Sequence, residues 1–186
     1  NQITWEECDI ELRIVPHDEE TGLPDLYELE KMAKKYSDRP LLIGAFTAGS
    51  NVTGILTPYH KMAAVMHRYG GKCFVDFAAA APYIDIDMHP ENPEEYLDAL
   101  MFSPHKFLGG PGTAGILVMN RSLYHNRVPD NPGGGTVRWT NPYGRHLYIE
   151  DIEVREDGGT PRLSAGHQDS LCPAAEKRHE HHPDPC

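Results

Sequence analysis

Three short apolar runs, separated by segments with helical spacing, constrain the fold of this chain most strongly. The runs are LLIGAF at 41–46, KCFVDF at 72–77 and GILVM at 115–119. Continuous apolar runs of this length are typical of strands buried on both faces of a parallel sheet. The segment IELRIVP at 10–16 alternates apolar and polar residues as a half-buried strand does, and 99–102 can open a further strand.

Helices are predicted between these strands. The segment PDLYELEKMAKKY at 24–36 has a proline near its start and apolar residues at helical spacing. A second helix is expected over 59–68 and a third over 94–100. The resulting order β-α-β-α-β-α-β-β indicates an α/β fold with three layers, α/β/α, in which helices cover both faces of a mostly parallel sheet.

Charge and composition exclude several classes of protein. With 186 residues, 39% of them hydrophobic, the chain is long enough for one domain or a large piece of one. The net charge of −11 argues against nucleic-acid binding. No apolar run approaches a membrane span and no signal peptide is visible, so a location in the cytoplasm or an organelle matrix is expected. Because the chain starts at Asn1 without methionine, we expect a fragment or a processed product.

The character of the sequence changes at Ser164. Residues 164–186 have no helical or strand period, so we predict a folded part over 1–163 and a disordered tail over 164–186. The tail contains clustered cysteines and histidines, but it lacks the regular ligand spacing of zinc sites. No metal site is therefore predicted.

Polar residues follow the predicted strands at 47–51, 76–79 and 103–106. Ligands of parallel sheets bind at the carboxyl ends of the strands, so these segments are the candidate site. Asp76 could cap the next turn or face a cationic group, and with Lys106 it could form a salt bridge or hold a cofactor. Pyridoxal phosphate requires such a pair: a lysine for its aldehyde and an acid for its pyridine nitrogen.

A glycine-rich loop at 109–112 follows Lys106. A nucleotide-binding P-loop would place its lysine after the glycines, so nucleotide binding is disfavoured. Ser103 and His105 can both donate hydrogen bonds to a phosphate, although His105 could equally be an ordinary loop histidine.

Several motifs in this order carry a resemblance to a known family. The chain resembles the class V aminotransferases, in their cysteine desulfurase and selenocysteine lyase branch, over roughly residues 1–163. The similar segments are N-x-x-x-W at 1–5, SNVTG at 50–54, VDFAAAAPY at 75–83, SPHKFLGGPGTAG at 103–115, PGGGTV at 132–137 and REDGGTP at 155–161.

The resemblance implies part of the large domain of a type I pyridoxal-phosphate-dependent transferase, acting on an amino acid. It implies that Lys106 forms the Schiff base with the cofactor and that Asp76 pairs with the pyridinium. Ser103 and His105 resemble the phosphate contacts, and Asn51 resembles the asparagine that helps hold the substrate carboxylate.

Gly135 and Thr136 look like the loop that reaches the cofactor phosphate of the other subunit, which implies a homodimer. The family's upstream phosphate loop and its C-terminal domain with the substrate-binding arginine have no counterpart here, and Ala79 stands where many relatives carry glutamine. Neither Cys172 nor Cys186 lies in a matching motif, so persulfide chemistry is not predicted. The alternative is an inactive remnant that keeps the fold and pairs with a full-length subunit.

Overall fold

The computed structural model describes residues 2–110 and 112–159. It divides into two compact units, residues 1–102 and residues from 103 onward, and each is described by itself. The tail predicted for 164–186 lies outside the described residues, and the folded part over 1–163 stays a prediction. None of the helices within 2–110 and 112–159 has the length and apolarity needed to cross a membrane.

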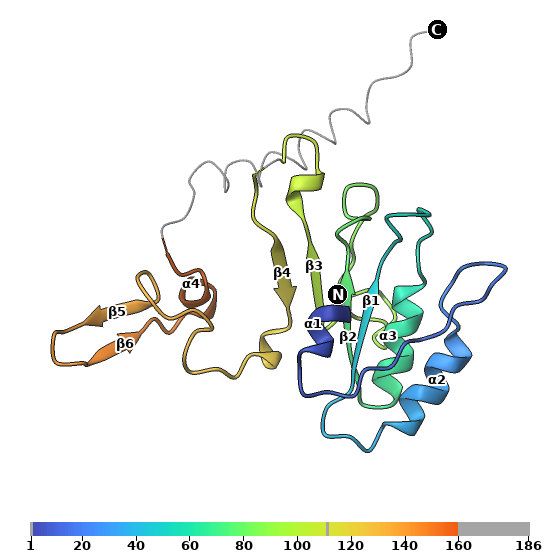
Figure 1. Ribbon diagram of the computed structural model, residues 1–186, viewed down its shortest axis with the longest axis horizontal. Coiled ribbons are helices and arrows are strands. Elements are labelled where there is room, and N and C mark those ends of the chain that lie inside the picture. Colours follow the sequence, from blue (N-terminus) through green and yellow to red (C-terminus); the bar gives the residue numbers. More distant parts are fainter. Residues whose placement is uncertain (1, 111, 160–186) are drawn as a thin grey trace, which may run out of the picture. The chain divides into compact units, whose positions relative to one another are not determined.

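The first unit is built on parallel strands (Figure 1). Strand β2 pairs with both β1 and β3, and its last residue, Asp76, lies opposite Thr47 of β1 and Met101 of β3. The elements are α1 (Gln2–Glu6), α2 (Leu26–Lys35), β1 (Ile43–Thr47), α3 (Tyr59–Arg68), β2 (Lys72–Asp76) and β3 (Ala99–Phe102). The helices predicted over 24–36 and 59–68 and the strands predicted near 41–46, 72–77 and 99–102 are confirmed.

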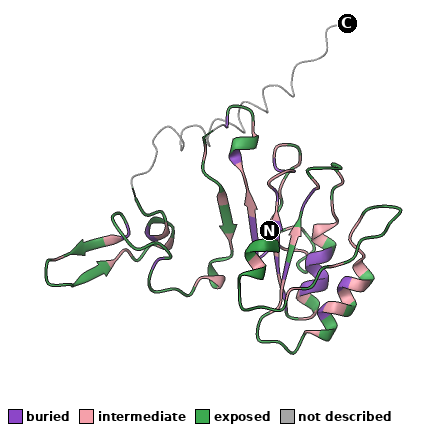
Figure 2. Ribbon diagram, viewed as in Figure 1, coloured by how far each residue is buried: buried purple, intermediate pink, exposed green. Residues whose placement is uncertain are grey.

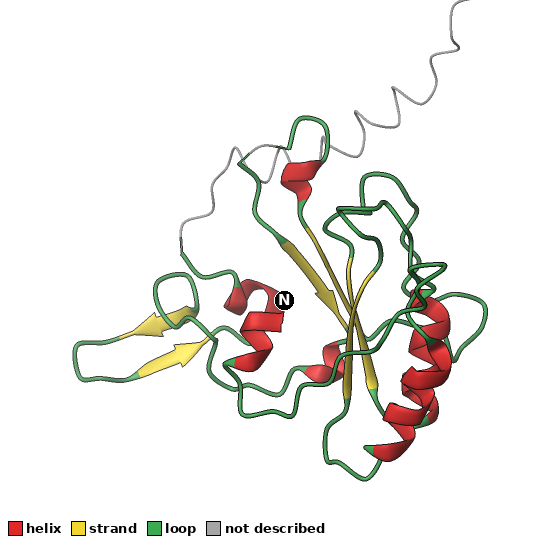
Figure 3. Ribbon diagram, turned by 45° about the vertical axis from the view of Figure 1, so that its right-hand side comes forward, coloured by secondary structure: helices red, strands yellow, loops and turns green. Residues whose placement is uncertain are grey.

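Helices α2 and α3 lie side by side, and α3 packs on β1 and β2 (Figure 3). Helix α2 begins after Asp25, whose carboxylate accepts hydrogen bonds from Tyr27 N and Glu28 N. Buried residues of this unit lie on α3, on β2 and β3, and on the segments next to these strands (Figure 2). The core between the helices consists of Leu29, Ala33, Met62, Val65 and Met66.

The strand predicted over 10–16 is wrong, because these residues form no strand. Ile10 and Ile14 are 51% and 57% exposed. The alternating apolar residues therefore do not form the buried face of a strand. The segment is instead an extended arm that packs Val15 against the core between the helices. Glu11 fixes the arm by an ion pair with Arg39 at 2.9 Å.

The helix predicted over 94–100 is also wrong. Residues 92–95 form a turn, in which Glu95 N donates to Asn92 O, and the chain then runs directly into β3. Two histidines of α3 hydrogen bond to backbone carbonyls that would accept bonds within a helix. His60 Nδ1 lies 2.8 Å from Glu95 O, and His67 Nδ1 lies 2.7 Å from Glu94 O. These long-range contacts override the local helical preference.

The second unit contains short elements. They are the 3₁₀ helices η1 (Pro104–Lys106) and η2 (Arg121–Leu123), the strands β4 (Ile116–Met119), β5 (Val137–Thr140) and β6 (His146–Tyr148), and the helix α4 (Ile152–Glu156). Strand β4 confirms the prediction for 115–119. The antiparallel β5–β6 hairpin was not predicted. Its turn is closed by Asn141 Oδ1, which accepts from Tyr143 N and Arg145 N.

Candidate functional site

In the first unit, the carboxyl ends of β1 and β2 lie at the same edge of the sheet. Thr47 and Asp76 are register partners, and Ala48 N donates to Asp76 O at 2.8 Å. The loop that follows β1 therefore starts beside Asp76. This agrees with the expectation that the candidate site lies at the carboxyl ends of the parallel strands.

The loop after β1 holds Asn51 in a tight turn. Ser50 Oγ accepts from Val52 N at 3.2 Å and from Thr53 N at 3.1 Å, so Ser50 fixes the backbone on the far side of Asn51. Asn51 itself is exposed. Its amide can therefore be offered to a ligand without breaking the turn.

Asp76 caps the turn that follows β2. Its Oδ1 accepts a hydrogen bond from Ala78 N at 2.7 Å, and the residue is half-buried. This is the capping role that the sequence left open. The bond also fixes the direction of the carboxylate, so capping and pairing with a cationic ligand group are compatible.

In the second unit, Lys106 closes the short helix η1. Lys106 N donates to Ser103 O at 3.0 Å, which places Ser103 at the start of this turn and Lys106 at its end. His105 and Lys106 are exposed, whereas Ser103 is half-buried and Pro104 is buried. Pro104 thus packs into the protein, while the side chains of His105 and Lys106 remain accessible to solvent.

The glycine-rich loop folds back onto η1. A Cβ on Gly110 would lie 1.9 Å from Pro104 O, so only glycine permits this approach. Gly110 N donates to Phe107 O at 2.9 Å, which closes the return. The glycine at 110 therefore serves the turn that carries Lys106.

The loop 133–136, with Gly135 and Thr136, is closed by a threonine. Thr136 is 1% exposed, and its hydroxyl donates to Gly133 O at 2.7 Å and accepts from Gly133 N at 3.1 Å. Gly135 has φ +87°, a left-handed conformation that favours glycine. The buried Thr136 hydroxyl thus fixes the backbone of the loop through its two hydrogen bonds to Gly133.

Two backbone amides of this loop remain available to a ligand. Among the described residues, the N–H groups of Gly134 and Gly135 have no hydrogen-bond acceptor, and a Cβ on Gly134 would meet nothing within 4 Å. Successive backbone N–H groups that lack an acceptor can form a site that favours an anion. The loop can therefore contact a phosphate through its backbone.

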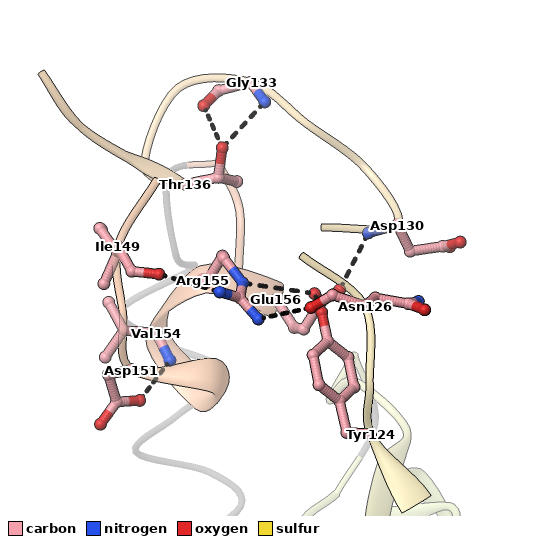
Figure 4. A network of polar contacts seen from close by, with 10 residues as sticks. All are labelled: Tyr124, Asn126, Asp130, Gly133, Thr136, Ile149, Asp151, Val154, Arg155 and Glu156. Atoms are coloured by element: carbon pink, nitrogen blue, oxygen red, sulfur yellow. Dashed lines mark hydrogen bonds and ion pairs between the residues drawn. The ribbon is translucent and has the colours of Figure 1, made fainter. Parts of the chain in front are cut away.

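A polar network behind this loop was not predicted (Figure 4). The buried Arg155 donates to Ile149 O at 3.3 Å and to Asn126 O at 3.1 Å. Glu156 accepts from Tyr124 Oη and from Asp130 N. The Tyr124 hydroxyl, Asp130 N and the Arg155 charge hold the pKa of Glu156 below its usual range. The only signal in the sequence was that Arg155 and Glu156 open the motif REDGGTP.

A second unpredicted network surrounds Asp98, which is 1% exposed. Asp98 Oδ2 accepts from His67 Nε2 at 2.8 Å and from Cys73 N at 2.9 Å, and Lys72 Nζ lies 3.1 Å from Oδ1. The hydrogen bond to Asp98 raises the pKa of Lys72, and burial raises the pKa of Cys73 to about 12. This network joins α3, β2 and the start of β3.

The predicted site residues divide between the two units. Asn51 and Asp76 belong to the first, and the other predicted site residues belong to the second: Ser103, His105, Lys106, Gly135 and Thr136. Within the described residues, no group of three or more histidine, cysteine or acidic side chains could hold a metal ion.

Comparison with known proteins decides the family. The sequence matches the family model described as Aminotransferase class-V over residues 2–166. The chain belongs to this family. The match confirms the resemblance seen in the sequence. Class V aminotransferases depend on pyridoxal phosphate.

Curated relatives are longer than this class V aminotransferase chain. A cysteine desulfurase from Synechococcus elongatus is 29% identical over 141 residues, which are 74% of this chain and 21% of that protein. A probable cysteine desulfurase from Aeropyrum pernix is 32% identical over 116 residues, which are 61% of this chain and 27% of that protein. The chain thus spans about a quarter of the length of these relatives.

Solved structures confirm the fold. The apo cysteine desulfurase of Thermococcus onnurineus is similar with a TM-score of 0.76 and 22% identity, over 95% of this chain and 41% of that chain. The cysteine desulfurase CsdA from Escherichia coli gives a TM-score of 0.71 at 24% identity, over 91% of this chain and 39% of that chain. The predicted type I fold of pyridoxal-phosphate-dependent transferases is therefore correct, and the chain covers part of it.

Proposed function

We propose that this chain is the cofactor-binding part of a pyridoxal-phosphate-dependent enzyme that acts on an amino acid. The observation that supports the proposal is the local setting of each residue: Asp76 ends the parallel strand β2 and is fixed by Ala78 N, and Lys106 ends the turn η1 that follows β3. The donor set fits the cofactor: a carboxylate for its pyridine nitrogen, an amine for its aldehyde and two backbone amides without an acceptor among the described residues for its phosphate.

Each residue has a defined task in this proposal. Lys106 would hold the cofactor through its amine, and once freed from the cofactor this amine would carry the substrate's α-proton. Asp76 keeps the pyridine nitrogen protonated, and when bound the cofactor supplies the electron sink for reactions at the α-carbon. Ser103 and His105 donate to the phosphate, and the exposed amide of Asn51 holds the substrate carboxylate.

The loop with Gly135 and Thr136 would contact a phosphate through its backbone amides, since the Thr136 hydroxyl is already engaged. In a homodimer this phosphate would belong to the cofactor of the partner subunit. An amino acid is the proposed substrate class, in keeping with the two relatives described above, which are named for an amino acid, cysteine.

Borohydride trapping tests the cofactor site. The purified chain is mixed with pyridoxal phosphate, reduced with borohydride and analysed by peptide mass spectrometry. We expect one stable adduct on Lys106, which is lost in Lys106→Ala and kept in the control Lys61→Ala, an exposed lysine of α3. An adduct that survives Lys106→Ala, or no adduct in the parent chain, would contradict the proposal.

The alternative proposal is a chain that keeps the fold without activity and pairs with a longer subunit. Exposed apolar side chains in the second unit favour it, among them Leu117, Val118, Val128 and Val154. A Lys106 adduct without turnover of any amino acid, together with a stable complex with a full-length relative, would support this alternative. Turnover by the chain alone would exclude it.

A further inference from the structure

Helix α4 and the residues that flank it make three hydrogen-bonded connections to the loop that starts at Asp130 and ends at Thr136. The first holds the entry to the loop, where Asp130 N donates to Glu156 Oε2 at 3.1 Å. The second holds its middle, where Gly159 N donates to Gly134 O at 2.8 Å. A single turn of chain thus fixes the loop at two separated points.

The third connection holds the end of the loop through Ile149. Thr136 O accepts from Ile149 N at 3.0 Å, and Ile149 O accepts from Arg155 Nη1 at 3.3 Å. Arg155 is 9% exposed and also bonds Asn126 O, so its position is fixed from two directions. The last residue of the loop is therefore tied to the same helix as its first.

The contact between the loop and the residues after α4 leaves no room for side chains. A Cβ on Gly158 would lie 2.7 Å from Thr136 Cγ2, and a Cβ on Gly135 would lie 3.1 Å from Gly159 N. A shift of α4 would therefore be transmitted to Gly134 and Gly135, whose N–H groups have no acceptor among the described residues.

Glu156 connects α4 to Tyr124, which precedes the loop in the sequence, and to Asp130, where the loop starts. Its two carboxylate oxygens accept from different partners, Tyr124 Oη and Asp130 N (Figure 4). Arg155 Nε lies 4.0 Å from Glu156 Oε1. Tyr124, Arg155 and Asp130 are thus the groups that face this carboxylate, and they determine where it lies.

We infer that Glu156 is a positioning residue that holds the Gly134 and Gly135 amides in the geometry needed to bind a phosphate. Glu156 acts through Asp130 and through α4, and it does not itself contact the ligand. The inference rests on the proposed function only for the identity of the phosphate, which would belong to the cofactor.

Amide hydrogen exchange of the whole chain tests the positioning role without any cofactor. In Glu156→Ala, the amides of Thr136 and Gly159, which donate to Gly133 O and Gly134 O of the loop, should exchange about tenfold faster, as expected for losing a hydrogen bond to a charged group. The amides of β1–β3 should keep their parent rates. Glu153→Ala is the matched control, because Glu153 lies exposed on the same helix.

Glu156→Gln separates hydrogen bonding from charge. The glutamine oxygen can accept from Asp130 N while its NH₂ group donates to the Tyr124 hydroxyl, so this variant should retain slow exchange in the loop. Unchanged exchange at Thr136 and Gly159 in Glu156→Ala would overturn the inference. Fast exchange in both Glu156 variants would overturn the assigned hydrogen-bonding role.

Comparing pyridoxal phosphate with pyridoxal measures the consequence for phosphate binding. The affinity ratio of the two compounds should fall in Glu156→Ala and remain at the parent value in Glu153→Ala. A ratio unchanged in Glu156→Ala would overturn the link to the phosphate. A parent chain that binds neither compound would contradict the proposed function, and the exchange rates would still decide whether Glu156 positions the loop.

Discussion

Cys73 shows how burial decides the chemistry of one residue. It is 0% exposed in the middle of β2, and its pKa is raised to about 12, chiefly by burial and also by the nearby Asp98 charge. Because the thiolate is the reactive form of cysteine, the native protein should hold this thiol unreactive at mildly alkaline pH.

We predict that Cys73 reacts with a thiol reagent only after unfolding, whereas the exposed Cys8 reacts at once. The measurement is Ellman's titration in a Cys172→Ser, Cys186→Ser background, first native and then in urea. One thiol should react in the native protein and a second one after denaturation. Cys8→Ser is the control and should abolish the fast reaction. Two fast thiols in the native protein would contradict the assigned burial.

The individual site residues differ in how far the sequence could predict them. Asp76 and Lys106 were identifiable because a polar residue at the end of an apolar run is a local signal. The capping bond of Asp76 to Ala78 N was foreseen as one of two alternatives. Glu156 could not be found, since its partners Tyr124 and Asp130 lie far from it in the sequence, and periodicity says nothing about such contacts.

At the scale of elements, helix α3 was predicted residue for residue, whereas two neighbouring segments were not. The segment 10–16 has the alternation of a strand, but it has no strand to pair with. The segment 94–100 has helical composition, but the histidines of α3 bind its carbonyls and Asp98 is drawn into the core. In both cases tertiary contacts decided the structure.

The Asp98 network gives a prediction about the elements that it joins. Asp98→Ala would leave the Cys73 amide, the His67 ring and the Lys72 ammonium without their common acceptor. Breaking a buried charge pair from one side costs about 3–5 kcal/mol in the free energy of unfolding. Urea unfolding followed by circular dichroism measures this loss. Glu28→Ala is the control, because Glu28 forms an exposed ion pair with Lys31.

The Lys72 contribution should depend on pH with a definite sign. The folded-state pKa of Lys72 is raised above 10.5 by its hydrogen bond to Asp98, so its stabilising effect is complete below that value and is lost as the pH rises through the folded pKa. The side chain is 35% exposed, so Lys72→Met should cost at most about 1 kcal/mol. The difference between parent and variant should therefore vanish in strong alkali. A difference that persists there would contradict the ion pair.

At the scale of the whole molecule, the two units differ in their cores. Apart from Pro104 and Pro129, every buried apolar side chain that the structure describes lies between Leu29 and Leu100 and belongs to the first unit. In the described part of the second unit, the buried polar or charged residues are Thr136 and Arg155, while Trp139 and Leu147 are 46% and 44% exposed. Since burial of a large apolar side chain contributes about 1.5–3 kcal/mol, the first unit should be the more stable.

We therefore expect the second unit to unfold at a lower urea concentration than the first. In Trp5→Phe, Trp139 fluorescence reports on the second unit, and far-UV circular dichroism is dominated by α2 and α3 of the first. The fluorescence transition should precede the dichroism transition, which is a departure from two-state unfolding. Asp98→Ala in this background should shift only the dichroism transition, because Asp98 lies in the first unit. Coincident transitions that move together would show that the units unfold as one, and the weak core of the second unit would then be stabilised by contacts that its own described residues do not supply.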